Sequence, residues 1–168
     1  MTPNEPIIRE LYDEMNKGQD AFVAAFRKLV ADVAAHKDVG RRWIEALNAG
    51  NLDALDQLAT PDYVYHGSGY DLQGIGELKA FVRYLLATFP DMKFIVNRVI
   101  VEGDLMAMHF TLTGTQERDF MGMPPRGGRL DLPVLTMSRL RDGRIAEDWE
   151  AYDSAEMMRQ LEAAVVTV

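Results

Sequence analysis

Apolar residues recur three or four positions apart through the first half of the chain, which is the spacing of one helix face. The pattern predicts a short helix over residues 8–15 and a longer amphipathic stretch over residues 22–47, which Gly50 ends. A third, short helix is expected over residues 53–58, and Pro61 terminates it because proline cannot continue a helix.

The second half of the chain alternates apolar and polar side chains, which is the period of a strand. After a short β-rich run at residues 62–66 and one more helix over residues 75–89, two hairpins and a terminal helix capped by Ser154 are expected. The hairpin strands are residues 92–101 with 105–115, around Glu102-Gly103-Asp104, and residues 130–140 with 145–152, around Asp142-Gly143. Helices followed by antiparallel strands indicate an α+β protein with helices packed on one face of a sheet.

Length and composition narrow the class of protein. At 168 residues, one domain is expected, with residues 1–36 as an appended helical arm and residues 37–168 as the domain itself. The net charge of −8 argues against binding to nucleic acid or to an anionic membrane. The sequence shows no cysteine, no apolar run of about 20 residues and no signal peptide, which favours a cytoplasmic protein.

The histidines do not predict a metal site. The three histidines, His36, His66 and His109, lie far apart in the sequence, and no pair has the spacing of zinc ligands. We therefore expect neither a metal nor another cofactor.

One strand carries a run of large apolar side chains on a single face. Met106, Met108, Phe110 and Leu112 alternate with smaller or polar residues, and Met137 is expected to join them from the next strand. These residues are either ordinary core or the wall of an apolar pocket, which the flexible methionine side chain suits.

An aspartate stands where the last strand passes into the terminal helix. Asp153 follows Trp149 and Tyr152, and burial beside these rings would raise its pKa from about 3.9 toward the range of a general base. The alternative role for Asp153 is to cap the helix. His66 shares one strand face with Val64, and it is either a structural histidine or a polar partner for Asp153.

Several motifs come in an order that resembles the SnoaL-like polyketide cyclases of the NTF2-like superfamily. They are Phe89-Pro90-Asp91, Glu102-Gly103-Asp104, Thr113-Gly114-Thr115, residues 120–125 and residues 142–149. The resemblance covers about residues 39–161. It implies a cone-shaped α+β barrel, in which a strongly curved antiparallel sheet and N-terminal helices enclose a pocket, and a homodimer built on the outer face of the sheet.

The resemblance also implies ring closure by intramolecular aldol condensation without a cofactor. By motif, the family's general base corresponds to Asp153 and its neighbouring histidine to His66. The chain differs from the family's pattern at three places: Val64 replaces a polar residue, Gln116 replaces a histidine, and residues 135–137 contain no histidine.

The remaining pocket candidates come from aromatic residues and a loop. Trp149 is expected to form the pocket floor, Trp43 and Tyr70 its wall or lid, and the Met121 loop to hang over its mouth. Glu147 is interpreted as a structural partner of Arg139 or as a second carboxylate.

Three functions remain open at this point. The first is a cyclase or isomerase that acts on a small apolar carbonyl compound, with Asp153 as base. The second is an epoxide or lactone hydrolase of the same superfamily. The third is a noncatalytic dimeric module that binds a small apolar molecule.

Overall fold

The computed structural model describes residues 5–163. The elements in chain order are α1 (Glu5–Asn16), α2 (Gln19–Ala49), the 3-10 helix η1 (Leu52–Gln57), β1 (Ala59–His66), β2 (Asp71–Gln73), α3 (Gly74–Thr88), β3 (Lys93–Glu102), β4 (Leu105–Thr115), β5 (Arg129–Arg141), β6 (Arg144–Tyr152) and α4 (Ser154–Glu162). No helix in this part of the chain is long and apolar enough to cross a membrane.

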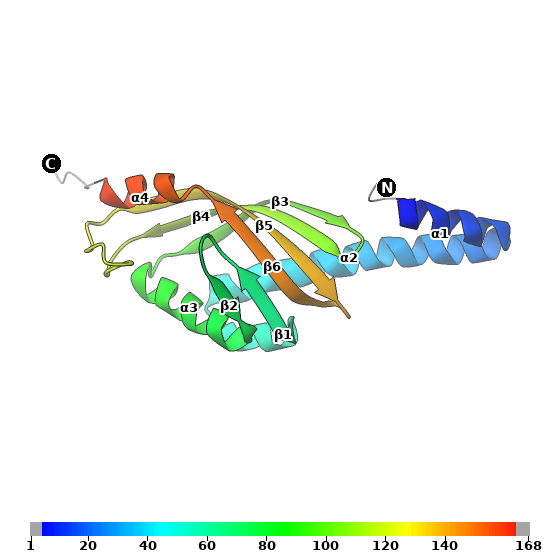
Figure 1. Cartoon of the computed structure of the whole chain (residues 1–168), viewed down its shortest axis with the longest axis horizontal. Coiled ribbons are helices and arrows are strands. Elements are labelled where there is room, and N and C mark those ends of the chain that lie inside the picture. Colours follow the sequence, from blue (N-terminus) through cyan, green and yellow to red (C-terminus); the bar gives the residue numbers. More distant parts are fainter. Residues whose placement is uncertain (1–4, 164–168) are drawn as a thin grey trace.

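The strands form one six-stranded sheet in the order β2-β1-β6-β5-β4-β3. All neighbouring strands are antiparallel except β1 and β6, which are parallel. The sheet curves around α3 and the second half of α2, which cover its inner face, and it stays open rather than closing into a barrel (Figure 1). The predicted α+β class and the curved sheet are therefore confirmed.

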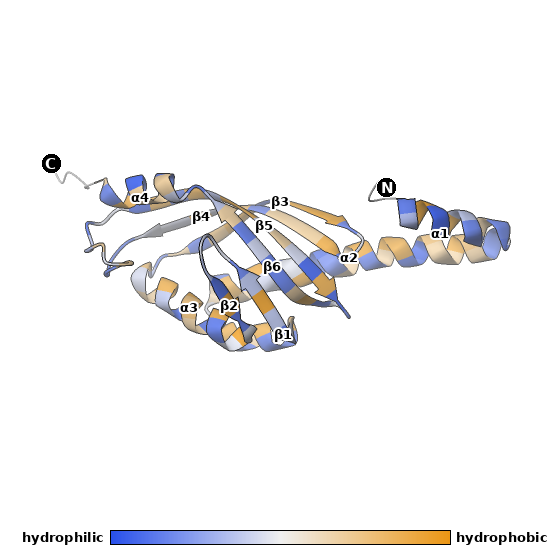
Figure 2. Ribbon diagram, viewed as in Figure 1, coloured by the Kyte–Doolittle hydropathy of each residue, from blue (hydrophilic) through white to orange (hydrophobic). Residues whose placement is uncertain are grey.

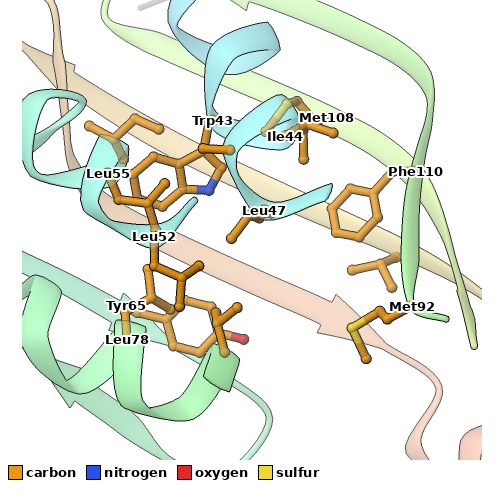
Figure 3. Packing of buried hydrophobic residues seen from close by; sticks show 14 of the residues in the cluster. Trp43, Ile44, Leu47, Leu52, Leu55, Tyr65, Leu78, Met92, Met108 and Phe110 are labelled. Carbon is orange, nitrogen blue, oxygen red and sulfur yellow. The ribbon is translucent and has the colours of Figure 1, made fainter. Parts of the chain in front are cut away.

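The core lies between the inner face and these helices. Figure 3 shows Trp43, Ile44 and Leu47 of α2 directed toward the sheet, with Met108 and Phe110 of β4 opposite them. The helix approaches the sheet closely at Gly40, where an added Cβ would lie 2.6 Å from the sulfur of Met106. A glycine at this position permits a contact that a larger residue would obstruct.

A helical hairpin projects from the domain. It consists of α1 and residues 19–38 of α2, and we call it the arm (Figure 1). Every buried residue of α2 lies at or after Val39, so the arm makes no contribution to the core. Figure 2 shows apolar residues along the arm outside the domain. The expected boundary at residues 36 and 37 falls inside a continuous helix.

Two element boundaries differ from the prediction. Strand β1 begins at Ala59 and includes Pro61, which was expected to separate a helix from a strand. The pairing of β1 with β6 is irregular between Ala59 and Val64, so the missing N–H of proline falls where the ladder is interrupted. At α4 the expectation that Ser154 is the cap is wrong, because Asp153 occupies that position. The predicted end of α2 at Gly50 is confirmed by its left-handed φ of 65°.

Candidate functional site

A cavity of about 100 Å³ lies between the inner face of the sheet and helices α2 and α3. Its wall is mostly aromatic and aliphatic. The polar exceptions are side chains from β1, β5 and β6 and a tyrosine from the loop before β2: Tyr63, Tyr65, Tyr70, Thr136, Asp148, Glu150 and Tyr152. An apolar wall with a few convergent polar groups is typical of a small-molecule site, and a volume of about 100 Å³ lies below the roughly 300–1,000 Å³ of most such sites.

Two carboxyl groups from β6 face this cavity, and each accepts a hydrogen bond from a tyrosine of β1. Tyr63 Oη donates to Asp148 Oδ2 at 2.9 Å, and Tyr65 Oη donates to Glu150 Oε1 at 2.7 Å. The hydroxyl of Tyr70 lies 3.5 Å from that of Tyr65. Asp148 and Glu150 stand two residues apart on one strand, so their side chains point to the same side of the sheet.

The surroundings make both carboxyls unusually weak acids. Burial raises the pKa of Asp148 from 3.8 to about 6, although hydroxyl groups of Ser138 and Tyr63 oppose the rise. Burial also raises the pKa of Glu150 from 4.5 to about 7; the hydrogen bond from Tyr65 opposes this rise, and the charge of Asp148 adds to it. A carboxyl that is half ionised near neutral pH can both take and return a proton under those conditions.

Thr136 adds an unused donor beside Glu150. The two residues are direct cross-strand partners on β5 and β6. Thr136 Oγ1 is buried and has no hydrogen-bond partner among the described residues. Thr136 is one of the polar residues of the cavity wall, so its hydroxyl is a candidate donor to a bound molecule.

The structure brings four of the predicted pocket residues to the cavity wall. They are Trp43, Met108, Phe110 and Tyr152. Tyr70 lines it as well, as a wall residue.

Four other predicted pocket residues lie elsewhere. Met137 pairs with Trp149 across β5 and β6, and both lie on the outer face of the sheet, so the expectation that they line the pocket is wrong. Val64 is also absent from the cavity wall. Met121 is 71% exposed, and its loop does not line the cavity.

Asp153 lies outside the cavity and caps α4. Its Oδ1 accepts a hydrogen bond from the backbone N–H of Glu156 at 3.0 Å. The residue borders a groove of about 690 Å³ on the outer face of the sheet, together with Arg98, His109 and Leu135.

His66 also lies on the outer face, inside a polar cluster. Its Nδ1 is 3.0 Å from Asp71 Oδ1 and its Nε2 is 3.1 Å from Glu147 Oε1. The ring stacks on Trp149, and the hydrogen bond with Glu147 raises the pKa of His66. Glu147 also lies 3.8 Å from Arg139, which agrees with its interpretation as a structural partner. The structure does not bring His66 and Asp153 together at the cavity, and their catalytic role stays a prediction.

A bulge in β6 explains why sequence reasoning missed Asp148 and Glu150. Ile145 pairs with Leu140 and Glu147 pairs with Arg139, so Ala146 is an extra residue in the ladder. Ile145 faces inward, and without the bulge Glu147 and Trp149 would do so too. The informative signal was in β5, where every second residue, Leu130, Leu132 and Val134, is apolar and faces inward. Thr136 continues this series, so its partner on β6, Glu150, also faces the cavity.

The charge of the cavity wall has one sign. Among residues 5–163, the wall contains two carboxyls but no lysine, arginine or histidine. In the same range, no group of three histidine or acidic side chains could hold a metal ion.

The comparisons with known proteins agree on one family. The family model described as SnoaL-like polyketide cyclase matches residues 37–161. Nogalonic acid methyl ester cyclase of Streptomyces nogalater is 27% identical over 124 residues, which cover 70% of this chain and 90% of that protein.

Solved structures show the same fold. The structure of IdmH from Streptomyces antibioticus is 35% identical with a TM-score of 0.68, and the match covers 75% of this chain and 97% of that one. A SnoaL-like protein from Jannaschia sp. CCS1 is 28% identical with a TM-score of 0.72, over 78% of this chain and 94% of that one. The family match begins at residue 37, so it leaves out α1 and most of the part of α2 that belongs to the arm.

Proposed function

This chain belongs to the SnoaL-like polyketide cyclase family, and we propose that it closes a carbon ring in a small, uncharged carbonyl compound by acid/base chemistry without a cofactor. The observation that carries the proposal is the Glu150 carboxyl, which has a pKa of about 7 and faces an apolar cavity. A noncatalytic binding module would gain nothing from a buried carboxyl that costs free energy to ionise.

Glu150 is the general base in this proposal. Its carboxylate removes a proton from the carbon next to a carbonyl group, and the enolate carbon then attacks a second carbonyl of the same molecule. Protonated Glu150 returns the proton to the alkoxide that ring closure forms, so the proton count balances. The cavity holds the two reacting carbons together, which replaces a search in solution.

Two neighbours assist Glu150. The unpaired hydroxyl of Thr136 donates to the enolate oxygen, where negative charge develops. Tyr65 holds the Glu150 carboxylate in place through the 2.7 Å hydrogen bond. Burial keeps Tyr65 protonated at neutral pH, because it raises the pKa of this phenol far above its ordinary value of 10.0.

The cavity wall selects an uncharged substrate. Among the described residues, the cavity wall has two carboxyls and no cationic side chain, so it would repel the carboxylate of a free acid. A neutral ester or ketone meets no such repulsion. The relative from Streptomyces nogalater is named for a methyl ester, which has this chemical character.

The hydrolase alternative has less support. It needs an arginine beside two carboxylates, and the candidates for that role, Arg139 and Glu147, lie on the outer face. The cyclase proposal needs only groups that the cavity contains.

The same proposal includes a homodimer on the outer face of the sheet. Ile95, Ile100, Leu135 and Met137 are 42–59% exposed on this face, and we call them the outer patch. Clustered apolar residues on a sheet face are typical of an interface between subunits.

A pair of matched variants tests the base. Nogalonic acid methyl ester is the probe, and both ring closure and deuterium uptake next to its carbonyls are followed. Glu150→Gln should lower turnover by about 10²- to 10⁴-fold, the usual contribution of a general base. Asp153→Asn should leave turnover within about threefold, because asparagine is an equally good helix cap. The reverse pattern would restore Asp153 as the base and sink the proposal for Glu150.

A further inference from the structure

Tyr70 differs from the other tyrosines of the cavity wall because it lies on a turn, between β1 and β2. Its hydroxyl is 3.5 Å from that of Tyr65, which donates to Glu150 at 2.7 Å. Among residues 5–163, Tyr65 is the one hydrogen-bond partner of the Glu150 carboxyl. Glu150, Tyr65 and Tyr70 therefore form a single chain of groups that can exchange protons, which we call the phenol chain.

The turn that carries Tyr70 is held in place by the fold. The backbone N–H of Gly67 donates to the carbonyl oxygen of Tyr70 at 2.8 Å, and His66 pairs with Asp71 in the antiparallel ladder of β1 and β2. The ring of Tyr70 packs on Phe81 of α3, with the ring centroids 5.3 Å apart. These contacts fix the position of the Tyr70 hydroxyl beside Tyr65.

A glycine in this turn gives the two phenol rings the space that they occupy. An added Cβ at Gly67 would lie 2.7 Å from Cζ of Tyr70 and 2.9 Å from Cε1 of Tyr65. A larger residue at this position would therefore push at least one ring away. The contact between the two hydroxyls depends on Gly67 for this reason.

The phenol chain runs from the cavity toward the surface. Tyr65 is 5% exposed, whereas Tyr70 is only partly buried, and its neighbours Ser68 and Gly69 are exposed. A proton that passes from Glu150 through Tyr65 to Tyr70 therefore comes within reach of solvent without crossing the apolar part of the wall.

The base needs such a path when the cavity is occupied. Glu150 has a pKa of about 7, so about half of the molecules at pH 7 hold it in the protonated form, which cannot act as a base. A substrate that binds to this form keeps bulk water away from the carboxyl. The reaction then waits until the proton leaves by another way.

The other groups around Glu150 are not bonded to it. Asp148 on the same strand adds a negative charge that favours protonated Glu150. Thr136 from β5, Tyr63 from β1 and Tyr152 from β6 contribute neutral hydroxyls, and the wall residues of α2 and α3 are uncharged. Among the described residues, the phenol chain is therefore the hydrogen-bonded path from the base.

We propose that Tyr65 and Tyr70 carry the proton of Glu150 to solvent, so that the base can ionise while a substrate is bound. This inference rests on the role proposed for Glu150. In one concerted passage, Glu150 gives its proton to Tyr65 Oη, Tyr65 gives its own hydrogen to Tyr70 Oη, and Tyr70 gives its hydrogen to a water molecule, which leaves as hydronium. Glu150 becomes a carboxylate, and each phenol again has one hydrogen.

The passage is concerted because a phenolate is a poor intermediate here. Burial raises the pKa of Tyr70 to about 12, and it also raises the pKa of Tyr65 above the ordinary value of 10.0. Each phenol therefore gains one hydrogen as it loses the other. After the passage, Tyr65 donates to the Glu150 carboxylate, which is the arrangement in the structure.

Single-turnover ring closure with enzyme in excess separates this role from a structural one. The probe is nogalonic acid methyl ester, and the wild type should react in one phase. Tyr70→Phe keeps the ring and loses the hydroxyl, so it should react in two phases. The fast phase should contain the molecules in which Glu150 is already ionised, roughly 10%, 50% and 90% of the total at about pH 6, 7 and 8. A purely structural defect would slow the reaction without making these amplitudes follow the pH.

Two further variants complete the test. Gly67→Ala should give the same two phases, because it separates the two phenol rings. Tyr84→Phe is the matched control, since Tyr84 lies outside the cavity wall and binds a backbone N–H, and it should react in one phase. A single phase for Tyr70→Phe at all three pH values would overturn the proton path and leave Glu150 as the base. Full ring closure by Glu150→Gln would instead refute the role of Glu150 on which the path depends.

Discussion

Replacing Thr136 by valine should lower turnover and raise stability at the same time. Valine has nearly the shape of threonine but lacks the hydroxyl. In the folded protein, Thr136 Oγ1 is buried without a hydrogen-bond partner among the described residues. A buried hydroxyl with no partner destabilises the fold, and it can still bind a substrate atom.

The two expected effects have different sizes and opposite signs. A hydrogen bond to a charged oxygen is worth about 1.5–3 kcal/mol, which corresponds to a loss of roughly 10- to 150-fold in kcat. An unpaired buried hydroxyl costs about 1–3 kcal/mol of desolvation, so its removal should raise the free energy of unfolding by about 1 kcal/mol. Thr136→Ser is the matched control: it keeps the donor and loses a methyl group, so kcat should stay within about threefold while stability falls by about 1 kcal/mol.

Two measurements on each variant decide the outcome. Urea unfolding gives the free energy of unfolding, and turnover of the probe used to test Glu150 gives kcat and KM. A Thr136→Val variant with wild-type kcat would refute the role of Thr136 as donor to the enolate. A variant that loses both stability and activity would show that the hydroxyl has a structural partner after all.

Three further outcomes are expected. Because burial raises the pKa of Asp148 from 3.8 to about 6, the folded state binds that proton more tightly than the unfolded state, and this carboxyl should lower the free energy of unfolding as the pH rises from about 4 to about 6. Asp148→Asn should remove this part of the slope and leave the part that comes from Glu150, whose pKa is raised from 4.5 to about 7; the variant should be more stable than the wild type in urea at pH 8, by on the order of 3 kcal/mol. Gly40→Ala should cost about 1 kcal/mol in the same assay, since the new methyl would lie 2.6 Å from a buried methionine sulfur, whereas Gly76→Ala, which enters open space, should be neutral or stabilising. The hydrogen bond with Glu147 raises the pKa of His66. The stabilisation by protonated His66 is therefore fully present below about pH 6.5, the ordinary histidine pKa, and is lost as the pH rises through the pKa of the folded state. His66→Gln should abolish that pH dependence and leave ring closure unchanged, whereas a loss of ring closure would support a catalytic histidine.

Hydrophobic periodicity was sufficient to predict most of the elements and one wall of the cavity, but it did not predict the three-residue strand β2 or the start of β1 at Ala59. Met108 and Phe110 alternate with polar residues on β4, so their shared face followed from the pleat of a strand. Gly50 predicted the end of α2 because the left-handed conformation there suits glycine. These features depend only on local spacing, which the sequence displays directly.

The face of β6 could not be predicted in the same way. Its assignment depends on the bulge at Ala146, a small residue that is compatible with either face, and on pairing with β5. The outer face of the sheet also carries large apolar side chains, such as Leu135 and Trp149, so hydrophobicity alone did not distinguish inside from outside.

The role of Asp153 was visible in a pattern that supports capping. Asp153 and Glu156 are three residues apart at the start of a helix, which is the spacing of a capping box. The observed hydrogen bond from Glu156 N–H to Asp153 agrees with that pattern. The choice between a cap and a catalytic base needed the position of the cavity, which local spacing does not reveal.

The central claim is that the proton-transferring carboxyl belongs to Glu150 inside the cavity. The most direct test is a ¹³C NMR titration of the glutamate carboxyls in the full chain, with the Glu150 signal assigned by its absence in Glu150→Gln. The account predicts a pKa of about 7 for Glu150. Titration of this carboxyl near its ordinary value of 4.5 would contradict the account, because such a group would be fully ionised, well solvated and a weak base at neutral pH.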